Sequence, residues 1–187
     1  NLKNGLPQKN LQQSCSKEWS SVTVHGKRGY VVRSVSHRDG KSCYPESSMD
    51  QFTLWVWGLW RYYRSELPEQ AEKEKIRLLL TELAGLCEKE LKNTTALRNP
   101  AGHWSGMTIL KNTPHHTAMR LPMFYAAAYD TTGSPHWKTL YQKAFEDGRQ
   151  QMENEKPRPW NTFTIPQHQI SMRLCWEVDT NPEHRAY

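Results

Sequence analysis

The sequence lacks most of the patterns that mark a membrane, nucleotide-binding or nucleic-acid-binding protein. No apolar run approaches the roughly 20 residues of a membrane span, and there is no P-loop or GxGxxG turn. The net charge is +6, but the basic residues are scattered and form no Lys/Arg-rich run. The opening NLKNGLPQKN does not resemble a signal peptide. We therefore expect neither a membrane nor a nucleic acid as the partner.

Cysteine is also scarce. The four residues are far apart and include no CxxC pair, so they do not suggest a thiolate metal site. Cys87 and Cys175 lie among apolar residues, which predicts buried thiols. Cys15 and Cys43 lie in polar segments, where a bridge between them is possible. This pattern does not identify the redox compartment.

Aromatic residues are abundant, with eight Trp, eight Tyr and four Phe among 187 residues. Two interpretations remain open. The rings could form a Trp-rich helical core, or some of them could line a cleft in which sugar rings stack on indole faces. With 24% charged and 36% hydrophobic residues, the chain is expected to form one globular domain over residues 1–187.

Helical periodicity organises most of the chain. Residues 49–67, residues 118–129 and the segment from Pro166 to Val178 are apolar on almost every side, which predicts buried helices. The segments that begin at Pro68 and Pro135 show a single apolar stripe, which is typical of outer helices. Long loops at 92–117 and 154–169 separate the pairs. The order predicts a repeat of helical hairpins.

The N-terminal part reads differently. Residues 1–20 predict an irregular lead-in. Alternating apolar residues over 21–36, interrupted by the turn-like HGKRG, predict a short β-hairpin. Asp39-Gly40 is the turn signal of the next loop. Ser47 and Ser48, each three residues before a polar partner, fit a capping box that opens the first helix.

Two segments resemble a known family. SSMDQFTLWVWGLWRYY looks like the S-x-x-D-Q-x-x-x-x-x-x-G-L segment of the six-hairpin glycosidase superfamily. AYDTTGSPHWKTLYQKA looks like the A-Y-x-x-T-G-x-P-x-Y stretch between inner and outer helices of that superfamily. The resemblance covers about residues 44–178. It implies an all-α fold of (α/α)-toroid type, with the short β-hairpin near the N-terminus. Because a complete toroid has six hairpins, it also implies that this chain belongs to a longer polypeptide.

The resemblance implies a secreted or periplasmic carbohydrate-active enzyme without a cofactor. We expect a glycoside hydrolase that cleaves a poly- or oligosaccharide with paired carboxylates. A polysaccharide lyase that acts on a uronate-containing glycan is the alternative, and a non-catalytic domain that binds glycan or protein is a third possibility. In such toroids the loops entering the inner helices build the site, which points to residues 37–51, 98–120 and 157–169.

Asp50 is the first candidate for a catalytic carboxylate, since it lies at the mouth of an inner helix. Glu46, with Asp39 as the other choice, is the candidate second carboxylate. A capping role would explain Asp50 without any chemistry, and Glu46 could be a solvated surface charge.

His115 and His116 are the candidate bases of the lyase alternative, in which Tyr44 protonates the leaving oxygen. They could equally be polar residues that precede a helix, and Trp160 could pack on a neighbouring hairpin. The histidine spacing does not favour a metal site. The candidate substrate-binding residues are Tyr44, Gln51, His103, Trp104, Arg120, Trp160 and His168.

Overall fold

The computed structural model describes residues 22–113, 117–154, 162 and 164–182, and these residues are mainly helical. The helical fold class expected from the sequence is confirmed. The predicted lead-in at 1–20 lies outside the described residues. The long helices of the described part are α2 (Met49–Tyr63), α3 (Gln70–Glu90), α4 (Arg120–Thr132), α5 (Pro135–Asn154) and α6 (Thr164–Val178).

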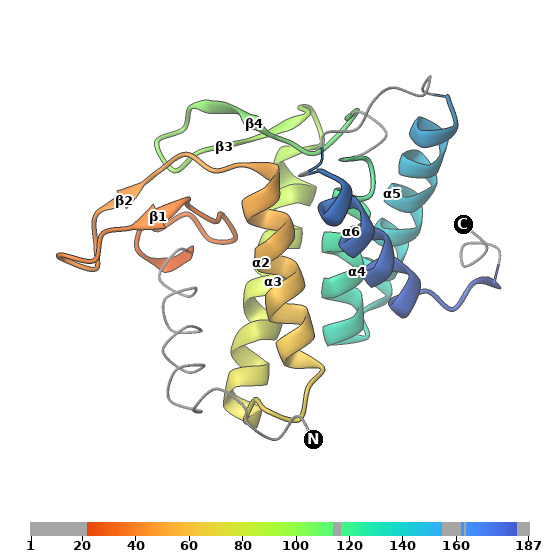
Figure 1. The fold of residues 1–187 in the computed structure, drawn as a ribbon, viewed down its shortest axis with the longest axis horizontal. Helices are drawn as coiled ribbons and strands as arrows, with labels where there is room; N and C mark the ends of the chain where they lie inside the picture. Colours follow the sequence, from red (N-terminus) through yellow and green to blue (C-terminus); the bar gives the residue numbers. More distant parts are fainter. Residues whose placement is uncertain (1–21, 114–116, 155–161, 163, 183–187) are drawn as a thin grey trace.

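The helices alternate between the interior and the outside (Figure 1). α2, α4 and α6 run in the same general direction, and each of the three packs on the other two. α3 returns antiparallel against α2 and α4, and α5 returns antiparallel against α4. α4 matches the predicted buried helix, and α3 and α5 lie outside it. The prediction that α6 is buried is wrong: α6 buries one stripe that ends in Leu174, Cys175 and Val178, and Trp176 on its other face is 52% exposed.

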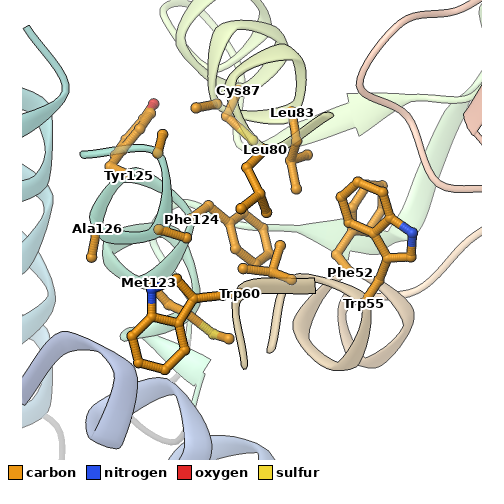
Figure 2. Packing of buried hydrophobic residues seen from close by; sticks show 14 of the residues in the cluster. Phe52, Trp55, Trp60, Leu80, Leu83, Cys87, Met123, Phe124, Tyr125 and Ala126 are labelled. Atoms are coloured by element: carbon orange, nitrogen blue, oxygen red, sulfur yellow. The ribbon is translucent and has the colours of Figure 1, made fainter. Parts of the chain in front are cut away.

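α4 is enclosed on all sides. Residues 123–128 are each at most 5% exposed. Figure 2 shows the Phe124 ring beside Leu80 of α3, and its centroid lies 6.3 Å from that of Phe52 in α2. Burial of one such ring contributes about 1.5–3 kcal/mol. The short alanine side chains that follow Tyr125 let the neighbouring helices approach α4 closely.

α2 is less enclosed than its composition predicts. Leu54 is 54% exposed, and Gly58 and Arg61 continue an exposed stripe along the same face. The helix ends at Tyr63, with Arg64 as its C-cap, and does not reach the predicted end near residue 67. The expectation that α2 is surrounded is therefore only partly met.

The β-hairpin predicted over 21–36 is wrong in its position. The observed strands are β1 (Ser34–Val35) and β2 (Cys43–Tyr44), which pair antiparallel across the turn at Asp39. Earlier in the segment, residues 30–32 are consecutively buried, at most 3% exposed. Apolar residues buried on both sides of the chain do not alternate as those of a half-buried strand do, so this segment is a packed extended stretch.

The predicted loop at 92–117 contains a second antiparallel pair. β3 (Ala96–Arg98) and β4 (Trp104–Ile109) pair with a bulge, and Arg98 lies opposite Trp104. The hairpin lies across the end of the bundle where α2 begins (Figure 1).

Three of the four helix starts marked by proline are confirmed, while α3 begins at Gln70, two residues after the predicted start at Pro68. Pro135 is the first residue of α5, while Pro122 and Pro166 lie in the first turns of α4 and α6. Proline is tolerated there because the first-turn N–H groups have no partner within the helix.

Candidate functional site

The N-terminal ends of the three inner helices lie together at the upper end of Figure 1. Asp50 is in the first turn of α2, Arg120 is the first residue of α4, and Gln167 is in the first turn of α6. Parallel packing of three helices brings their first turns to the same height. The resulting cluster of these three residues is here called the mouth cluster.

Arg120 is the most deeply buried charge of the mouth cluster, with 3% of its surface exposed. Its Nη2 donates a hydrogen bond to Oε1 of Gln167, whereas its Nε has no hydrogen-bond partner among the described residues. Burial lowers the pKa of Arg120 to about 10, and the negative charge of Asp50 opposes this shift. The guanidinium thus joins α4 to α6 and faces Asp50. So deep a position argues against direct bidentate contact with a sugar carboxylate.

Asp50 is half-buried, and the predicted capping box beside it is not formed. Ser48 is the N-cap of α2, but it makes no side-chain cap bond. The hydroxyls of Ser47 and Ser48 are buried without a hydrogen-bond partner in the part of the chain that the structure describes. Capping therefore does not account for the polar residues at this end of α2.

Glu46 lies on the same loop and is tied to the β3–β4 hairpin. Its Oε1 accepts a hydrogen bond of 2.7 Å from Nδ2 of Asn99. Burial raises the pKa of Tyr30, and the charge of Glu46 adds to this effect. One oxygen of Glu46 therefore holds the loop against the hairpin, and a catalytic role of Glu46 comes in addition to this structural contact.

Trp104 and His103 are exposed on the hairpin that the sequence presents as a loop. The guanidinium of Arg98 lies over the Trp104 ring at 4.1 Å from its centroid. The backbone N–H of His103 donates to Oδ1 of Asn99 at 2.9 Å. Through Asn99 the hairpin is joined to Glu46 and so to the loop that enters α2.

The remaining predicted residues are spread around the mouth cluster. Tyr44 is 53% exposed on β2, while Gln51 in the first turn of α2 and His168 on α6 are half-buried. His115, His116 and Trp160 lie outside the described residues.

The described residues form neither a metal-binding group nor a membrane-spanning helix. No group of three or more His, Cys, Asp or Glu side chains there could hold a metal ion. No helix in the same ranges has the length and apolar character that a membrane crossing requires.

The comparisons with known proteins add no relationship. No protein-family model, curated protein or solved structure matches the chain.

Gln167 and Arg98 are site residues that sequence reasoning missed. Gln167 is in the loop segment 157–169 that was singled out, but only the contact between α4 and α6 shows its role. A signal for Arg98 was present, since NPAG at 99–102 is a turn sequence between two runs that can form strands. With that hairpin assigned, Arg98 and Trp104 become neighbours across the strands.

Proposed function

We propose that this chain is a carbohydrate-active domain, a glycoside hydrolase in which Asp50 is a catalytic carboxylate. The observation that carries the proposal is the position of Asp50 in the mouth cluster. It is half-buried where three helices begin, beside a buried guanidinium, and the capping role that competed with catalysis is not formed. A carboxylate at a polar mouth of an otherwise apolar bundle is a typical place for chemistry.

In this proposal Asp50 is one of the two carboxylates that flank the glycosidic bond, and its charge interacts with the buried guanidinium of Arg120 at the start of α4.

Glu46 is our proposed second carboxylate. It is four residues before Asp50 on the loop that enters α2, and the Asn99 amide fixes one of its oxygens. The pair would serve as acid and base on opposite sides of a glycosidic bond.

The scaffold we propose is of (α/α)-toroid type. In support, α2, α4 and α6 form an inner set with their mouths at one end, and α3 and α5 form an outer set. One feature differs from the open arc that three neighbouring inner helices form in a toroid. Here α2 packs directly on α6, so that the three inner helices form a triangle.

The proposal is tested with Asp50→Asn and a matched control. Glu66 is an exposed carboxylate after the C-terminal end of α2, at the other end of that helix from Asp50, and Glu66→Gln removes one charge there. Both variants and the wild type are incubated with a panel of poly- and oligosaccharides. Reducing ends report hydrolysis, and ultraviolet absorbance of an unsaturated product reports elimination.

We expect reducing ends without new absorbance, and a loss of rate in Asp50→Asn of about 100-fold or more. Glu66→Gln should keep the wild-type rate, and thermal melting should show both variants folded. New absorbance would replace the hydrolase with the lyase. No turnover of any glycan, or an unchanged rate in Asp50→Asn, would refute the proposal.

A further inference from the structure

A shallow cavity of about 450 Å³ opens beside the β3–β4 hairpin. It lies between the hairpin and the segment that leaves α3. None of its lining residues is charged. They are Asn93, Thr94, Thr95, Ala96, Trp104, Ser105, Gly106 and Ile109.

Trp104 forms an aromatic wall of this cavity. It is 49% exposed, and Arg98, its partner across the strands, stacks on the ring at 4.1 Å. Arg98 is not among the lining residues, so the guanidinium supports the indole from outside the cavity. A ring held in this way loses little freedom when a ligand stacks on it.

Polar side chains on the segment that leaves α3 can bond to the hydroxyls of a ligand. Thr94 lines the cavity and donates its hydroxyl hydrogen to the carbonyl of Glu90 at 2.7 Å, so its oxygen can still accept from a ligand. Ser105 does not contribute, because its Oγ is buried from solvent and it follows Trp104 on β4, where successive side chains lie on opposite faces.

We propose that this cavity is a subsite for one uncharged sugar ring of an oligosaccharide. An apolar sugar face stacks on Trp104, and a ring hydroxyl donates to Thr94. The absence of charged lining residues favours a neutral sugar over a uronate. The inference rests on the proposed function in one respect: the turn of the same hairpin holds the proposed second carboxylate, because the Asn99 amide donates to Glu46.

The test measures binding separately from turnover on the whole 187-residue chain. Calorimetric titrations use cello-, malto-, xylo- and chitohexaose, with the matching monosaccharides as short probes. Trp104→Ala removes the stacking surface of the cavity, and Trp104→Phe keeps an aromatic ring there. Trp176→Ala is the control, since Trp176 is 52% exposed on α6.

We expect one hexaose to bind the wild type and its monosaccharide to bind far more weakly. Trp104→Ala should weaken the hexaose by about tenfold. Trp104→Phe should keep most of the affinity, because the phenyl ring still offers a face for stacking. Trp176→Ala should bind as the wild type does.

The two proposals fail in different ways. If a hexaose binds and is cleaved but Trp104→Ala does not change its affinity, the subsite is refuted and the hydrolase stands. If a hexaose binds through Trp104 but no glycan is cleaved, the hydrolase is refuted and the subsite stands. Failure of the wild type to bind every probe at millimolar concentration overturns the subsite.

Discussion

Tyr141 and Asp179 form a buried polar contact between α5 and the residue that follows α6. The Tyr141 hydroxyl donates to Oδ2 of Asp179, and burial raises the pKa of this tyrosine above its ordinary value. Both residues are at most 7% exposed. A hydrogen bond to a buried carboxylate is stronger than one between neutral groups, because water does not compete for it.

Tyr141→Phe should therefore destabilise the fold by about 1.5–3 kcal/mol. The phenylalanine ring fills the same space, so the loss reports the hydrogen bond alone. Urea denaturation measures it. Tyr44→Phe is the control, since Tyr44 is 53% exposed, and surface changes usually stay within about 0.5 kcal/mol. Equal losses in the two variants would show that the buried contact contributes nothing.

At the scale of elements, Gly29 joins the segment before α2 to α3. Its φ is +77°, and a Cβ there would lie 2.2 Å from the carbonyl oxygen of Glu82. Gly26 has a similar φ of +73° but open space around it. The two glycines share one backbone conformation and differ only in their surroundings.

Gly26→Ala should lower the free energy of unfolding by about 1–2 kcal/mol, because a Cβ disfavours the left-handed backbone conformation. Gly29→Ala should cost a further 1–3 kcal/mol or so, because the methyl group forces two backbones apart. Urea denaturation of both variants measures the difference. Losses that match would mean that residues 22–33 do not pack on α3 as the structure shows.

The sequence predicts the helices well because their signals are local. Pro135 starts α5, and the apolar residues of α4 leave no polar face. The β3–β4 pairing depends on a bulge and on residues several positions apart, so the same segment reads as a loop. The prediction of a strand at residues 30–32 fails for a similar reason. These residues are buried by tertiary packing on both sides of the chain, and the alternation of apolar residues in the sequence does not reveal this.

For the candidate site, too, the sequence predicts individual residues but not the contacts between helices. Asp50 and Arg120 stand out because each is polar in the first turn of an apolar helix. Their meeting with Gln167 depends on how three helices pack together, which the spacing within one helix does not encode. The sequence also does not reveal that the helix cap is missing, since Ser47 and Ser48 fit the capping pattern and yet form no side-chain cap bond.

At the scale of the whole molecule, α3 and α6 share one core through α4. Cys87 of α3 and Cys175 of α6 belong to the same hydrophobic cluster, and both are at most 1% exposed. Burial raises the pKa of each thiol. Because the thiolate is the reactive form, each should react only when the molecule opens.

Reaction with a disulfide reagent then measures how the molecule opens. In the double variant Cys15→Ser and Cys43→Ser, only Cys87 and Cys175 remain. If α3 and α6 belong to one cooperative unit, both thiols should react slowly, with equal opening free energies that fall in parallel as urea is added. Peptide mapping of the labelled protein assigns each rate. Faster labelling of Cys175 would show that α6 opens separately, so that Gln167 leaves Arg120 before the rest of the core unfolds.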